Sequence, residues 1–192
     1  MKIELTFTAD ARYKCDGLPG SISLLEGLTG VRGCQACPRF TYCPLSHVAA
    51  VATEISDLTA LRAACNELGL QFMEGQTTYA WFGQWVGDYH GEDAAYKQGI
   101  DPSEYGKCSH AIKVPGSTYE IGVKKLANGN HTLIYDFYGP GRKIMEKLGK
   151  GCEKLVQHYG LNKAQMIARA KGLITQRKPL LNGDIKLVVT GV

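Results

Sequence analysis

The stretch that decides the fold runs from Tyr119 to Tyr138 and reads YEIGVKKLANGNHTLIYDFY. Two runs of strand-forming residues flank Asn128-Gly129, and this dipeptide between such runs is the strongest short-range signal for a tight β-hairpin. The expected register places Asp136 opposite Ile121, on the same side as Ile134. Asp136 is therefore predicted to be a half-buried carboxylate, which either serves a ligand site or pairs with Arg142.

Turn signals and hydrophobic periodicity on both sides of this hairpin predict an α+β fold. Two further hairpins are predicted, one from residues 2–8 with 11–16 and one from residues 173–180 with 184–190. Three helices are predicted at residues 57–69, 144–159 and 162–172, and Asn162 is expected to cap the last of them. An antiparallel sheet with helices on one face accounts for these elements. The expected fold is ferredoxin-like, preceded by a small Cys-rich metal-binding segment.

The first 45 residues carry four of the seven cysteines: Cys15, Cys34, Cys37 and Cys43. Four thiolates close a tetrahedral zinc site or hold an iron–sulfur cluster, and zinc is the preferred interpretation because it needs only the four ligands. His47 is an alternative to Cys15 as the fourth ligand, and a set of free thiols is the competing interpretation. We therefore expect a Cys-rich segment at residues 1–45 and an α+β domain at residues 46–192.

The composition is that of a protein from a reducing compartment. Its 192 residues contain no apolar run long enough to cross a membrane. At the N-terminus, apolar and polar residues alternate as in a strand, whereas a signal peptide has an unbroken apolar core. An odd number of cysteines argues against a secreted disulfide framework. We expect a cytoplasmic protein with no membrane partner.

Positive charge is concentrated in one region. The formal net charge is +4, but residues 139–179 hold ten Lys and Arg residues and only two acidic residues. Such a concentration is typical of a protein with a polyanionic partner, and Lys147, Lys154 and Arg169 are the candidate nucleic-acid contacts. A solvated helix face is the alternative interpretation.

The turn before the long helix is a candidate phosphate site. Here Tyr138, Gly139 and Gly141 lead into Arg142 and Lys143. The glycines expose backbone N–H groups, and the basic side chains add donors, so a phosphate could bind at this point. The motif lacks the complete phosphate-loop signature, and a plain tight turn explains it equally well.

An aromatic run follows the helix expected at residues 57–69, at Tyr79, Trp81, Phe82, Trp85 and Tyr89. Aromatic rings beside basic residues can stack on a purine or on single-stranded nucleic acid, which makes Trp81 and Trp85 candidate ligand contacts. Packing in the core is the alternative for the same residues.

Several motifs lie along residues 46–189: Ser46-His47, Tyr119–Gly122, Tyr135–Gly139, and a tail from His158–Gly160 through Lys171-Gly172 to Asn182–Leu187. Together they resemble the domain of unknown function 1257 family of plastid, cyanobacterial and phage proteins. The resemblance implies the fold and a cytoplasmic setting, in a phage case the host cytoplasm, and it implies no activity.

The sequence shows no Ser/His/Asp order, no supported Cys/His pair and no paired carboxylates on one element. We therefore expect a non-enzymatic protein that binds a nucleotide or nucleic acid, with a homo-oligomer that sequesters nucleotides as one concrete form. The alternative is an iron–sulfur redox or adaptor module that docks a partner protein such as an ATPase.

Overall fold

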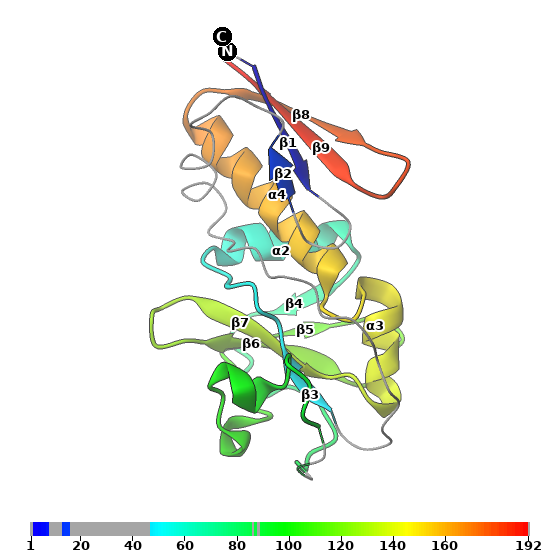
Figure 1. The fold of residues 1–192 in the computed structure, drawn as a ribbon. Coiled ribbons are helices and arrows are strands. Elements are labelled where there is room, and N and C mark those ends of the chain that lie inside the picture. The colour runs from blue at the N-terminus through cyan, green and yellow to red at the C-terminus, as the bar shows by residue number, and fades with distance from the viewer. Residues whose placement is uncertain (1, 8–12, 16–46, 86, 88, 192) are drawn as a thin grey trace. The chain divides into compact units, whose positions relative to one another are not determined.

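The structure is a computed structural model that describes residues 2–7, 13–15, 47–85, 87 and 89–191. It is α+β, with two antiparallel sheets that belong to two compact units (Figure 1). Among the described residues, unit 1 contains 2–7, 13–15, 57–64 and 153–191, and unit 2 contains 47–56, 65–85, 87 and 89–152.

Unit 1 is built on a sheet with the strand order β2-β1-β9-β8. Its strands are β1 (Lys2–Phe7), β2 (Tyr13–Cys15), β8 (Ile174–Pro179) and β9 (Ile185–Thr190). The N-terminal hairpin of β1 and β2 and the C-terminal hairpin of β8 and β9 are confirmed. β1 also pairs with β9 along its whole length, so this sheet joins the two ends of the chain across the boundary expected at residue 45.

Helix α4 (Glu153–Ala170) packs on this sheet because both elements present an apolar face. Alternate residues of β1 and β9, among them Leu5 and Leu187, form one buried cluster with Leu161, Ala164 and Ala168 of the helix. The Gln157 side chain fixes the contact by donating hydrogen bonds to the carbonyl oxygens of Phe7 and Gly183, at 2.8 and 3.1 Å.

Unit 2 is built on a sheet with the order β3-β7-β6-β5-β4. Its strands are β3 (Val48–Ala50), β4 (Gln71–Met73), β5 (His110–Lys113), β6 (Glu120–Lys125) and β7 (His131–Asp136). Short helices η1 (Ala95–Gln98), η2 (Pro102–Glu104), η3 (Gly139–Gly141) and α3 (Arg142–Leu148) complete the unit. Residues 79–105 contribute Tyr79, Ala95, Ile100 and Tyr105 to the core that packs on β3, β5 and β7.

The two predicted Asn-Gly hairpins therefore lie in different sheets. The α+β class is confirmed, whereas the single ferredoxin-like sheet is replaced by two sheets. The physical reason is that each hairpin pairs with a strand that is distant in the sequence, β7 with β3 and β9 with β1. Local sequence patterns do not predict such pairings.

The register of the first hairpin differs from the prediction by one residue. Leu126 and Asn130 close a three-residue loop in which Gly129 has a φ of 85°, so the turn ends in a glycine bulge rather than in a two-residue turn. The observed pairs are Gly122 with Ile134 and Val123 with Leu133. Asp136 consequently does not lie opposite Ile121, and it pairs with Val48 of β3 on its other side.

The helices confirm one boundary and correct another. α2 (Leu58–Glu67) begins where the Asp57 carboxylate accepts the N–H groups of Thr59 and Ala60, as its sequence predicts. The helix expected over residues 144–159 is wrong, because Gly149 (φ 88°) and Cys152 (φ 54°) interrupt it between α3 and α4. Asn162 is not a cap and lies inside α4, where it donates to the carbonyl oxygen of His158.

Candidate functional site

The candidate site is organised by Asp136, the last residue of β7. Its side chain is fully buried, and Oδ1 accepts the backbone N–H groups of His47 and Tyr138, at 3.1 and 3.0 Å. The backbone of Phe82 also interacts favourably with the ionised carboxyl. Three segments that are far apart in the chain therefore converge on one carboxylate.

Burial disfavours the ionised form of the Asp136 carboxyl. Burial raises the pKa of this carboxyl above its usual range, although the backbone groups of Tyr138, His47 and Phe82 partly counteract that rise. Oδ2 has no hydrogen-bond partner of normal geometry within the described part of the chain. Asp136 is fully buried, and its hydrogen bonds hold the backbone of its neighbours.

The turn after Asp136 is satisfied by its own hydrogen bonds. The N–H of Gly141 donates to the Tyr138 carbonyl at 2.9 Å, and the N–H of Arg142 points at the carbonyl oxygens of Gly139 and Pro140. Gly141 is required for a packing reason, because a Cβ atom there would lie 1.8 Å from the Asp136 carbonyl oxygen. The N–H groups of Gly141 and Arg142 are thus used within the turn, which leaves the exposed side chain of Arg142 as the donor for a phosphate.

Four rings form what we call the aromatic cluster: His47, Tyr89, Phe137 and Tyr138. The buried His47 ring lies 4.9 Å from Tyr89, 5.0 Å from Phe137 and 5.7 Å from Tyr138. On the outer side of the cluster, the exposed Arg142 guanidinium lies 5.7 Å from the centre of the Tyr138 ring. This is the geometry of a cation–π contact, and it supports the Arg142 side chain at the surface of the turn.

A second cation, Lys150, contacts the same cluster. Its Nζ lies 5.8 Å from the centre of the Phe137 ring and 3.5 Å from a carboxylate oxygen of Asp93. The Tyr89 hydroxyl donates a short hydrogen bond to the other oxygen of Asp93. Lys150, Asp93 and Tyr89 thus form a connected chain of polar groups over the aromatic cluster.

The predicted aromatic contacts Trp81 and Trp85 lie in a separate group with Tyr96 and Tyr105, which we call the tryptophan cluster. Tyr105 meets Trp81 and Trp85 edge-on, at 5.9 and 6.2 Å. Trp81 is half-buried, whereas Trp85 is 36% exposed and the neighbouring Phe82 is 49% exposed. Part of the aromatic run is thus core, as the alternative interpretation expects, and Phe82 and Trp85 are open to a ligand.

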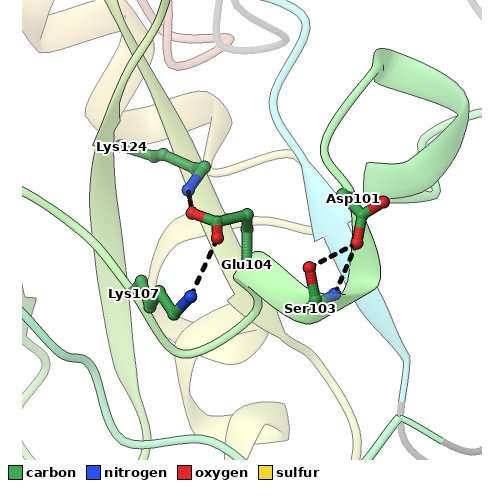
Figure 2. Close-up of polar contacts among 5 residues, drawn as sticks. All are labelled: Asp101, Ser103, Glu104, Lys107 and Lys124. Carbon is green, nitrogen blue, oxygen red and sulfur yellow. Dashed lines mark hydrogen bonds and ion pairs between the residues drawn. The ribbon is translucent and has the colours of Figure 1, made fainter.

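Figure 2 shows a small polar network formed by Asp101, Ser103, Glu104, Lys107 and Lys124. Glu104 pairs with Lys107 at 2.8 Å and with Lys124 of β6 at 3.2 Å, and these lysines lower the pKa of its carboxyl. Asp101 caps η2 by accepting both the N–H and the hydroxyl of Ser103. Glu104 directly precedes Tyr105, so the network ties the chain to β6 next to the residue on which both tryptophans pack.

The predicted basic contacts are distributed over both units. Lys147 belongs to unit 2, with Arg142, Lys143 and Lys150, whereas Lys154 and Arg169 belong to unit 1. Lys154 and Arg169 are both exposed, but they lie at opposite ends of α4, about 22 Å apart at 1.5 Å per residue. Lys143 is exposed and pairs with Glu146 at 2.9 Å.

Of the predicted metal ligands, Cys15 lies at the end of β2, opposite Leu5. Cys34, Cys37 and Cys43 fall outside the described residues. Within the described ranges, no group of three His, Cys, Asp or Glu side chains could hold a metal ion, which leaves the zinc or iron–sulfur prediction open. No helix among the described residues is long and apolar enough to span a membrane.

Sequence reasoning missed the residues that join these groups. From the sequence, His47 is an alternative metal ligand and part of a family motif, and no pattern gives Tyr89, Asp93 and Lys150 a common role. Their partners come from distant segments, so spacing could not pair them. The aromatic run from Tyr79 to Tyr89 is the signal in the sequence that points toward them.

Comparisons with known proteins identify no relative of this chain. No family model matches the chain, and neither a curated protein nor a solved structure matches it. The resemblance to the domain of unknown function 1257 family stays a prediction, and a functional interpretation depends on the geometry above.

Proposed function

We propose that unit 2 is a non-catalytic binding module for a phosphate-bearing aromatic ligand, a nucleotide or a nucleotide unit of a nucleic acid. The observation that carries the proposal is the convergence on Asp136. One buried carboxylate fastens both the segment that exposes Phe82 and the turn that exposes Arg142. An aromatic platform and a guanidinium are thereby anchored to the same point of the fold.

The chemistry of these two groups is complementary to that of a nucleotide. An exposed aromatic ring stacks on any base, and such stacking is worth about 1–3 kcal/mol per base. The planar guanidinium of Arg142 matches the oxygens of a phosphate and forms charge-assisted hydrogen bonds with them. Because the N–H groups of Gly141 and Arg142 are already used within the turn, the Arg142 side chain is the main phosphate contact in this proposal.

Charge favours unit 1 as the part that would contact a longer nucleic acid. Its described residues include ten Lys or Arg and four Asp or Glu, whereas those of unit 2 include nine and ten. Lys154 and Arg169 are exposed members of the basic set. Binding of a nucleic acid through unit 1 would weaken steeply with salt, since each neutralised phosphate releases counterions.

Calorimetric titration with ATP, adenosine and inorganic tripolyphosphate tests the module. We expect ATP to bind more tightly than either fragment, because the base and the phosphates contact different groups. Phe82→Ala should reduce the affinity for ATP and adenosine, and Arg142→Gln the affinity for ATP and tripolyphosphate. Lys125→Gln, which changes an exposed cation elsewhere in unit 2, is the matched control and should bind like the wild type.

Equal affinities of ATP and tripolyphosphate would contradict the aromatic half of the proposal. No binding of ATP and no binding of a single-stranded oligonucleotide would contradict the whole of it.

A further inference from the structure

The pair of Lys150 and Asp93 occupies a particular position beside the proposed ligand surface. The Lys150 ammonium lies over the Phe137 ring of the aromatic cluster, and the Arg142 guanidinium lies over the Tyr138 ring. Both rings contact the same histidine, because Phe137 and Tyr138 lie 5.0 and 5.7 Å from the His47 ring. Two cations held on rings of one cluster suit a ligand with more than one phosphate.

At present the anion on Lys150 comes from the protein itself. Asp93 lies 3.5 Å from the ammonium, and the Tyr89 hydroxyl holds the same carboxylate from the other side. Both members of the pair keep about a third of their side chains exposed, at 33% for Lys150 and 35% for Asp93. An ion pair with this exposure contributes little, so an external anion can replace one member at low cost.

We propose that Lys150 is a second phosphate-binding position of this site, and that the Asp93 carboxylate occupies it until a polyphosphate ligand displaces it. This inference rests on the proposed function, and it adds that the Asp93 carboxylate competes with the ligand for Lys150. The displaced carboxylate swings toward solvent while Lys150 keeps its place over Phe137. A phosphate group wins the exchange because it brings more negative charge and more acceptor oxygens than a carboxylate does.

The adjacent residue Glu92 supplies a matched control. It carries the same charge one position earlier, but it is 80% exposed and pairs with Lys97 at 3.4 Å instead of with Lys150. A variant at Glu92 therefore changes the net charge of the loop equally and leaves the Lys150 pair intact.

The experiment is a calorimetric titration of inorganic tripolyphosphate into the full chain and its variants at low ionic strength. Asp93→Asn should bind about two to five times more tightly than the wild type, the range that weak surface ion pairs contribute. Glu92→Gln should bind like the wild type. Lys150→Gln should bind more weakly, and the double variant of Asp93→Asn with Lys150→Gln should gain nothing over Lys150→Gln alone.

Urea denaturation of each variant verifies that it is folded. Should Asp93→Asn fail to fold, Tyr89→Phe removes the hydroxyl that holds Asp93 and should raise the affinity in the same direction by a smaller factor. The inference is overturned by an unchanged affinity in these variants, by an equal gain in Glu92→Gln, by a gain that persists without Lys150, or by no tripolyphosphate binding in any variant.

ATP separates this inference from the proposed function. A wild type that binds ATP more tightly than tripolyphosphate, together with no gain in Asp93→Asn, overturns the inference and leaves the proposed function standing. A gain for tripolyphosphate in Asp93→Asn, with ATP no better than tripolyphosphate, supports the inference and overturns recognition of the base.

Discussion

The backbone N–H of His47 donates a hydrogen bond to Asp136 Oδ1 over 3.1 Å, although 89 residues separate the two in the chain. The same oxygen accepts the N–H of Tyr138, at the start of the turn that follows Asp136. One buried carboxylate thus defines where the end of β7, the entry to β3 and the turn meet, and removing it should affect all three.

Asp136→Ala should lower the free energy of unfolding by about 2–4 kcal/mol, because it leaves two buried N–H groups without an acceptor. Asp136→Asn keeps an acceptor oxygen and removes the buried charge, so it should cost clearly less. Urea denaturation followed by circular dichroism measures both. Equal losses in the two variants would show that the charge, and not the acceptor, holds the segments.

Gly141→Ala should destabilise the protein by about 2–4 kcal/mol, since the new Cβ meets the Asp136 carbonyl oxygen at 1.8 Å and the turn must move. Pro140→Ala, at the exposed neighbouring position, is the control and should change the stability by much less. If Gly141→Ala kept full stability and lost only ligand binding, the glycine would serve a phosphate and the packing explanation would be wrong.

Much of the local structure could be predicted because its signals are local. Asn128-Gly129 and Asn182-Gly183 mark real hairpins, and Asp57 caps a real helix. The one-residue error in the register arose because Asn-Gly fits both a two-residue turn and a three-residue loop with a glycine bulge, and the sequence does not distinguish them.

The long-range part could not be predicted in the same way. No local pattern states that β1 pairs with β9, and the apolar stripe from Ile144 through Leu148 to Leu155 continues through the helix break, so periodicity hides it. The contacts within the site could not be predicted for a related reason, since His47, Asp93 and Lys150 meet only through tertiary contacts. Gly149 and Gly151 were the available warning of the break.

Stability should fall between neutral and mildly acidic pH, in part through His131. Burial, and then the nearby His110 ring at 5.9 Å, lower the pKa of His131 below its ordinary value. The unfolded chain therefore takes up the proton first as pH falls, and the stability present above about pH 6.5 is lost as pH drops through the folded-state pKa.

His131→Asn should flatten this part of the stability profile, measured as urea midpoints between pH 7.5 and 5. His90→Gln, which changes an exposed histidine bonded to Tyr96, is the control and should keep the wild-type slope. Parallel slopes for the wild type and His131→Asn would remove His131 as a cause.

The cysteine prediction is testable without reference to the fold. If Cys34, Cys37 and Cys43 bind zinc, protein purified without oxygen should contain about one equivalent of the metal, and Cys37→Ser should release it. Absorption near 400 nm with iron in place of zinc would indicate the cluster instead. Elemental analysis that finds neither metal would contradict both forms of the prediction.

The most direct test of the central claim is the melting temperature of the wild type and of Arg142→Gln, each with and without ATP. Arg142 is exposed, so its replacement should leave the melting temperature of the ligand-free protein nearly unchanged. At about 100 times its Kd, ATP should stabilise the wild type by about 2.7 kcal/mol and raise its melting temperature by several degrees. We expect Arg142→Gln to lose most of this increase; an ATP-dependent increase that is equal in both proteins, or absent from the wild type, would contradict the account.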